Sequence, residues 1–149
     1  MMLTKHFSLA EMIHSDEALR LGISNVPNEA EIENLRRLCV TILEPLRAAL
    51  GRPIVVTSGL RVPVLNTIIG GSTSSDHCFG RAADIKVDGK SAREVCGAIR
   101  SLALPYKQLI HEFGAWTHVS IGAPLDPPKR EELTAIKLAG RTSYQKGIA

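Results

Sequence analysis

Two side chains of metal-ligand type stand seven residues apart near the middle of the chain. Residues 72–84 read STSSDHCFGRAAD, in which His77 and Asp84 flank Gly80, and the apolar residues Ile85 and Val87 follow. An imidazole and a carboxylate at the start of a rigid strand are two of the three protein ligands that a catalytic zinc ion takes. The sequence therefore predicts part of a zinc site, whose third ligand comes from elsewhere in the chain.

The best candidate for the third ligand is His118, which lies in the later stretch EFGAWTHVS. A catalytic zinc ion keeps one coordination position open, and a hydrolytic site also needs a general base near the attacking water. Glu112, six residues before His118, can supply that base if both side chains point to one face of a hairpin.

The length of the hairpin loop decides which side chain shares a face with His118. A two-residue turn at 114–115 pairs His111 with His118 and directs Glu112 away. A three-residue loop over 113–115 places Glu112 on the face of His118 instead. The residue pattern alone leaves His111 and Glu112 as rivals for the role of base.

A histidine and an aspartate at this spacing are common by chance, so their context must support the metal site. Here a Gly/Ser-rich loop precedes His77, Asp84 enters a strand, and His118 lies on a hairpin strand. Cys78 is a possible zinc ligand by type, but neighbours on an extended chain point in opposite directions, so we interpret it as a packing residue. The context favours a site over coincidence.

The remaining cysteines do not suggest a disulfide framework. The chain has three cysteines, an odd number without paired spacing. Cys39 and Cys96 fall beside the apolar stripes of predicted helices, where a free cysteine behaves as a small hydrophobic residue. We therefore expect folding in a reducing compartment.

Three helices are predicted from capping boxes that begin at Ser8, Asn28 and Ser91. The longest follows Asn28 and carries apolar residues at spacings of three and four as far as Leu50. Pro45 lies inside this pattern and predicts a kink or break in the last turns.

Strands are predicted at 54–57 and 83–87, and a hairpin is predicted from 107–113 and 116–121. Helices and strands in this order indicate an α+β domain in which helices pack against a small antiparallel sheet that carries the zinc site.

The character of the sequence changes after Gly122. A proline-rich stretch is followed by polar and charged residues with little periodicity. We therefore predict a single domain over 1–122 and a weakly structured or extended tail over 123–149.

Composition places the chain among ordinary globular proteins. It has 149 residues, a net charge of +3 and 44% hydrophobic residues. No basic-plus-aromatic motif suggests nucleic-acid binding. Neither a secretory signal nor an apolar run long enough to cross a bilayer is evident. We expect a monomer made in the cytoplasm that reaches any target outside the cell through release by another protein.

Three segments together resemble the D-alanyl-D-alanine carboxypeptidase-like zinc metallopeptidases. They are SGLR, ending at Arg61, then SDHCFGRAAD and EFGAWTHVS. The wider superfamily includes phage endolysins, lysostaphin-type enzymes and the hedgehog signalling domain. The resemblance implies that His77, Asp84 and His118 bind zinc and that Glu112 is the base, which favours the three-residue loop.

The resemblance also implies contacts with substrate. Arg61 matches an arginine that faces the substrate carboxylate or the developing oxyanion, and Ser75 matches a serine that contacts substrate. Trp116 stands where several superfamily members have a second histidine. Because an indole cannot accept a proton, we expect Trp116 to form a wall of the substrate cleft.

The implied function is zinc-dependent hydrolysis of a peptide bond in peptidoglycan stem peptides or cross-bridges, of carboxypeptidase or endopeptidase type. A phage or prophage lysin fits the expected lack of a signal, and a cytosolic dipeptidase fits less well. The alternative from another class is a non-catalytic zinc-stabilised structural or binding module, such as a phage particle component. Glu112 distinguishes these alternatives, since only the enzyme needs a base there.

Overall fold

A six-stranded mixed sheet forms the centre of the computed structural model, which describes residues 1–72 and 74–149. The strand order is β1-β2-β4-β3-β5-β6. Thr73, in the polar loop predicted before His77, lies outside the described residues. The strands are β1 (Ile54–Ser58), β2 (Ala82–Val87), β3 (Gln108–Glu112), β4 (Trp116–Ser120), β5 (Glu131–Leu138) and β6 (Arg141–Lys146).

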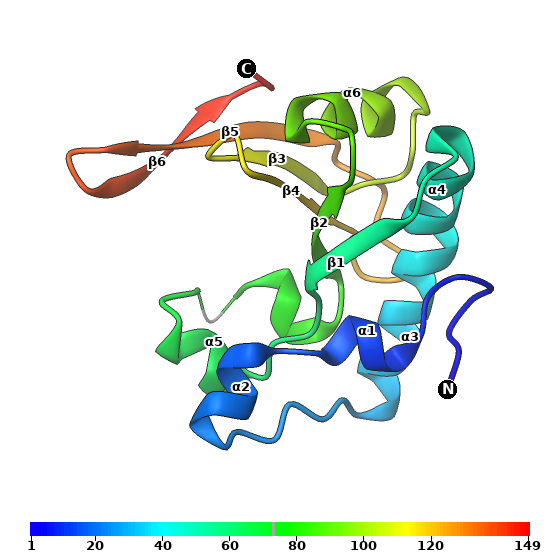
Figure 1. Cartoon of the computed structure of the whole chain (residues 1–149), viewed down its shortest axis with the longest axis vertical. Helices are drawn as coiled ribbons and strands as arrows, with labels where there is room; N and C mark the ends of the chain where they lie inside the picture. The colour runs from blue at the N-terminus through cyan, green and yellow to red at the C-terminus, as the bar shows by residue number, and fades with distance from the viewer. Residues whose placement is uncertain (73) are drawn as a thin grey trace.

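Helices connect and cover these strands (Figure 1). They are α1 (Leu9–Ile13), α2 (Asp16–Leu21), α3 (Glu29–Leu38), η1 (Cys39–Leu43), α4 (Glu44–Leu50), α5 (Pro63–Ile68), η2 (Asp76–Phe79) and α6 (Ala92–Ser101). The capping boxes predicted at Ser8, Asn28 and Ser91 are all present and open α1, α3 and α6. Within the described part of the chain, no helix is long and apolar enough to cross a membrane.

The long helix is not broken at Pro45, but its form changes just before this residue. The segments α3, η1 and α4 follow one another without interruption, and η1 is π-helical. The backbone N–H of Glu44 bonds to the Cys39 carbonyl, five residues back. Pro45 then occupies the first turn of α4, where its missing N–H is tolerated.

The hydrophobic core lies between one face of the sheet and the helices. Helix α6 contacts β2, β3 and β4. Ile85, Leu109 and Val119 from the sheet are buried in the same cluster as Leu38 and Ile42 from the long helix. Because side chains alternate along a strand, the residues next to these in sequence face the other side of the sheet. That second face is free for a functional site.

The predicted α+β class agrees with the structure, but the prediction of an antiparallel sheet is wrong. Strands β3 and β5 are parallel, with Ile110 opposite Leu133. The connection from β4 crosses over β3, so β5 enters the sheet in the direction of β3. The antiparallel prediction considered only the strands before Gly122, and those do pair in antiparallel fashion.

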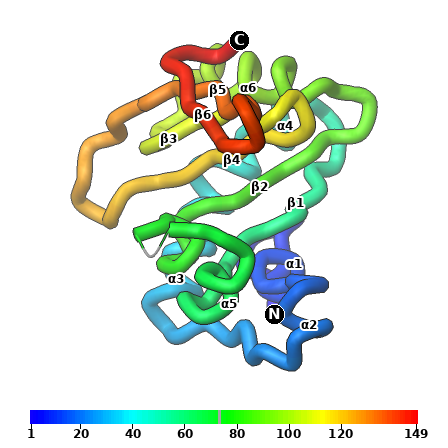
Figure 2. The backbone as a smooth tube through the Cα atoms, turned by 90° about the vertical axis from the view of Figure 1, so that its left-hand side faces the viewer, coloured from blue at the N-terminus to red at the C-terminus, as the bar shows by residue number. Residues whose placement is uncertain are grey.

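The sequence analysis did not predict β5 and β6, which lie in the segment expected to be weakly structured or extended. They form a hairpin through Ala139 and Gly140, both with positive φ. Most side chains of β6 are exposed, so this edge strand lacks the apolar alternation that identifies a half-buried strand. Figures 1 and 2 show the hairpin at the opposite end of the molecule from α2 and α5.

Gly59, just after β1, allows the chain to pass closely over α1. A Cβ atom at this position would overlap the carbonyl oxygen of Met12, whose bond to the backbone N–H of Leu60 is 2.8 Å long. Only glycine fits without moving one of these backbones.

Replacing Gly59 by alanine should therefore lower the free energy of unfolding by about 1–3 kcal/mol, as overpacking does. Gly97→Ala in α6 is the matched control, because a Cβ there would meet no atom within 4 Å beyond its neighbours in the helix. It should raise stability by about 0.5–1 kcal/mol through helix propensity. Chemical denaturation measures both values, and equal effects of the two substitutions would contradict this account of Gly59.

Candidate metal centre and its cleft

The strand register places the candidate ligands on the sheet face that the helices leave free. Asp84 on β2 lies opposite His118 on β4, and His118 lies opposite Ile110 on β3. Glu112 pairs with Trp116 across the hairpin, as the three-residue loop requires. His111, the rival base, pairs with Thr117 and faces the other side of the sheet. Glu112 and His118 therefore share one face.

His77 reaches this face from η2, the short 3₁₀-helix before β2. The Ser75 hydroxyl caps η2 by accepting the His77 backbone N–H at 3.2 Å. Gly80 ends η2 with a φ of 72°, and a Cβ there would press on the Glu31 carbonyl of α3. The sequence between His77 and Asp84 thus folds back tightly, which brings the two side chains together.

One ring nitrogen of His77 forms a hydrogen bond with the backbone. Its Nδ1 lies 2.7 Å from the carbonyl oxygen of Gly59, which can only accept a hydrogen bond. Nδ1 is therefore the donor, and in the neutral ring Nε2 carries the lone pair. His77 is 2% exposed, and burial lowers its pKa, which favours this neutral form.

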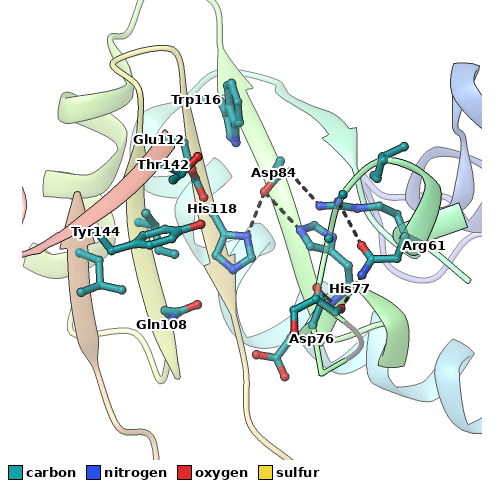
Figure 3. Close-up of a pocket in the computed structure, with 18 of the residues that line it drawn as sticks. Arg61, Asp76, His77, Asp84, Gln108, Glu112, Trp116, His118, Thr142 and Tyr144 are labelled. Carbon is teal, nitrogen blue, oxygen red and sulfur yellow. Dashed lines mark hydrogen bonds and ion pairs between the residues drawn. The ribbon is translucent and has the colours of Figure 1, made fainter. Parts of the chain in front are cut away.

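Asp84 is the centre of the group (Figure 3). Its Oδ1 lies 3.0 Å from His118 Nδ1 and 3.4 Å from His77 Nε2. Its Oδ2 accepts a hydrogen bond from Arg61 Nη2 at 3.4 Å. Burial alone would raise the pKa of this carboxyl, but the hydrogen bond from His118 and the neighbouring His77 ring outweigh it and hold the pKa well below its usual range.

These three side chains form a set that can hold a metal ion. One ligand atom from each of His77, Asp84 and His118 lies within 4.8 Å of the others. The buried Nε2 of His77 has no hydrogen-bond partner among the described residues. Its lone pair faces a carboxylate oxygen. Two electron-rich atoms repel each other unless a cation binds to both. Two imidazoles and a carboxylate are a ligand set that zinc uses.

Glu112 borders this group and is only 9% exposed. Burial is the main effect on its carboxyl and raises the pKa, and the negative charge of Asp84 acts in the same direction. The charges of His118 and Arg61 lower the pKa, but the net shift is upward. Figure 3 shows the side chain between those of Trp116 and His118. A carboxyl with a raised pKa beside a metal-ligand set has the properties of a general base.

Arg61 follows β1 and lies against Asp84 rather than free in the cleft. Its Nη1 donates to Asn66 Oδ1 at 3.3 Å, and its Nη2 donates to Asp84. The Asn66 amide in turn donates to the Ser72 carbonyl. Asn66 is a fully buried residue of α5 that the sequence analysis missed, because a single asparagine in a short helix carries no motif.

Ser75 and Trp116, the other residues predicted to contact substrate, line the cleft and also make contacts within the fold. Ser75 caps η2 and lines the cleft. The Trp116 ring packs edge-on against Phe113, with centroids 5.5 Å apart. Cys78 is buried and does not line the cleft, which agrees with its interpretation as a packing residue.

A cleft of about 630 Å³ surrounds the candidate metal centre. One wall comes from the loop before η2 and from α5, and another from the hairpin of β5 and β6. The hairpin residues that line it are Leu133, Lys137, Thr142 and Tyr144. Sequence reasoning missed all of them, because they belong to the segment predicted as a tail.

A comparison with family models gives a match over most of the chain. The model described as Peptidase M15 covers residues 5–120, which include every ligand candidate, Glu112 and Arg61. No curated protein matches the chain. The hairpin of β5 and β6 lies beyond the matched residues.

The lowered pKa of Asp84 predicts a pH-dependent contribution to stability. A depressed carboxyl pKa stabilises the fold above the ordinary aspartate pKa of about 3.9, and this contribution is lost as the pH falls. In the metal-free protein, Asp84→Asn should lower the free energy of unfolding by on the order of 2 kcal/mol at pH 7. This difference from the unmodified protein should shrink below about pH 4.

Asp88→Asn is the control, since Asp88 is exposed in the turn after the same strand. Denaturant unfolding at a series of pH values provides the measurement. A loss of stability in Asp84→Asn that stays the same from pH 7 to pH 3 would show that the carboxylate charge is not what matters.

Proposed function

The chain belongs to the peptidase M15 family of D-alanyl-D-alanine carboxypeptidase-like zinc metallopeptidases, and from this premise we propose that it hydrolyses a peptide bond in peptidoglycan. The substrate would be a stem peptide or cross-bridge, attacked in the manner of a carboxypeptidase or endopeptidase. The observation that carries the proposal is the His77–Asp84–His118 group with Glu112 on the same sheet face, inside one cleft.

The three ligand side chains would hold the metal. Zinc bound there would supply Lewis-acid chemistry and lower the pKa of water in its open position. The Gly59 carbonyl would keep the His77 ring in the tautomer whose Nε2 faces the cleft. Arg61 would fix the Asp84 carboxylate from its other oxygen.

Glu112 would act as the general base and then the general acid. Its carboxylate would take a proton from the attacking water as the water oxygen bonds to the scissile carbonyl carbon. When the C–N bond breaks, the same carboxyl would deliver that proton to the leaving amine. The burial that raises its pKa brings the carboxyl closer to the neutral pH at which both transfers must occur.

Arg61 would stabilise negative charge on the substrate. Its guanidinium is oriented by Asn66 and Asp84, and it lines the cleft. A guanidinium fixed in this way suits a carboxylate or a developing oxyanion. Trp116 would give the substrate an apolar wall, and the Ser75 hydroxyl a polar contact. Because Trp116 cannot carry a positive charge, stabilisation of the oxyanion falls mainly to Arg61.

The proposed substrate determines where the protein would act. Peptidoglycan lies outside the cytoplasmic membrane, so the protein would reach it after release from the cell, as a phage or prophage lysin does.

Digestion of purified peptidoglycan tests the proposal. The zinc-loaded protein should release fragments whose new ends, read by mass spectrometry, identify the bond that is cut. A chelator should stop the release, and added zinc should restore it. Glu112→Gln should keep its zinc and lose about 10²–10⁴-fold in rate, the usual contribution of a general base.

Glu29→Gln, on the exposed first turn of α3, is the matched control and should cleave at the normal rate. The proposal falls if the zinc-loaded protein releases no peptide fragment. It also falls if Glu112→Gln cleaves as fast as the control, because the base would then be elsewhere.

A further inference from the structure

The hairpin of β5 and β6 supplies a wall of the cleft although it lies outside the residues matched by the family model. Side chains opposite one another on neighbouring strands share a sheet face. Ala135 on β5 lies opposite Glu112 on β3, and Tyr144 on β6 lies opposite Ala135. One row therefore runs from Trp116 through Glu112 and Ala135 to Tyr144, all on the face of the candidate metal centre.

Tyr144 is directed from the hairpin toward that centre. Figure 3 shows its ring beside His118, with the hydroxyl on the side of His118 and Glu112. The side chain between Tyr144 and Glu112 in the row is only a methyl group, that of Ala135, so the ring is not kept away from the cleft. Tyr144 is 57% exposed, and no hydrogen bond joins its hydroxyl to another described residue. The hydroxyl is thus free to donate to a bound molecule.

Lys137 provides a positive charge on the same wall. Its Nζ donates to Thr142 Oγ1 at 3.1 Å and lies 5.2 Å from the centroid of the Phe113 ring. Both contacts are with neutral groups. Lys107, another lysine of the cleft, is instead paired with Asp76 at 3.0 Å. Among the described residues, no carboxylate forms an ion pair with Lys137.

The hairpin is anchored firmly enough to hold these two groups in place. The backbone N–H of Gly147 donates to the Glu132 carbonyl at 2.8 Å. The Thr134 hydroxyl donates to the Gly147 carbonyl at 2.7 Å. On β5, the Glu132 side chain accepts a hydrogen bond from Tyr106 at 2.6 Å. These contacts tie both strands to each other and to the body of the domain.

We propose that the β5–β6 hairpin is a substrate-binding wall, in which the Tyr144 hydroxyl donates to an oxygen of the bound peptide and Lys137 pairs with one of its carboxylates. This inference rests on the proposed peptidase function and adds to it a substrate class, an acidic peptide. Tyr144 would bind the part of the peptide that lies beside the metal centre. Lys137 would favour peptides that carry a carboxylate farther along the cleft.

Synthetic stem peptides test this wall. The probes are a pentapeptide ending in D-Ala-D-Ala with a free D-glutamyl carboxylate, and the same peptide with that carboxylate amidated. Zinc-loaded protein is assayed for kcat and KM. Binding without turnover is measured by calorimetry in the Glu112→Gln background, which gives a readout independent of activity.

Tyr144→Phe keeps the ring and removes only the hydroxyl, so it should lower kcat/KM about three- to tenfold for both probes, the loss expected for one hydrogen bond. Lys137→Gln should raise the Kd of the carboxylate probe about three- to fivefold, in the range of an exposed ion pair. It should leave the Kd of the amidated probe unchanged.

Arg141→Gln is the matched control, since Arg141 lies on the same hairpin opposite Leu138, and neither residue lines the cleft. If the unmodified protein cleaves the probes and both cleft variants behave like Arg141→Gln, the wall proposal fails while the peptidase function stands. If the unmodified protein neither binds nor cleaves the probes, or any stem peptide, both proposals fail together.

Discussion

The rest of the structure depends on the contacts that surround the carboxylate of Asp84. A carboxylate removed from water is strongly destabilising unless cations and hydrogen-bond donors surround it. Here His118 donates to one of its oxygens and Arg61 to the other, while His77 Nε2 lies 3.4 Å from Oδ1. Each comes from a different element, so the positions of β4, η2 and the end of β1 are all constrained by one side chain.

One face of the sheet packs in the hydrophobic core, and the other face carries the candidate metal centre. Along β2, Ala83 and Ile85 pack against the helices, while Asp84 between them points into the cleft. The alternation of a strand therefore places a polar site one residue away from a close-packed core. The same alternation on β3 separates Leu109, in the core, from Ile110 and Glu112, which line the cleft.

The sequence was informative where a local rule determines the structure. Capping boxes identified helix starts, and the spacing around His77 and Asp84 identified two side chains that the fold brings together. The choice of Glu112 over His111 depended on the hairpin register, which the residue pattern left open and only the family resemblance favoured. The structure has the three-residue register, with Phe113 and Gly114 at positive φ.

The features that sequence reasoning missed arise from long-range contacts. Strand β5 is held by its parallel pairing with β3, and β6 is an exposed edge with little apolar alternation. Neither property is visible within a short window of sequence. The role of Asn66 likewise appears only when Arg61 and the Ser72 carbonyl are brought beside it. The wall of the cleft that β5 and β6 form is therefore not predictable from local sequence patterns.

The central claim is that the group around Asp84 is a metal site, and titration of zinc into the metal-free protein tests it most directly. Calorimetry should show one zinc ion bound per chain, with a rise in melting temperature that depends on zinc concentration. His77→Ala should abolish this binding, whereas His14→Ala, at an exposed histidine, should bind as the unmodified protein does. An absence of saturable zinc binding, or unchanged binding in His77→Ala, would contradict the account.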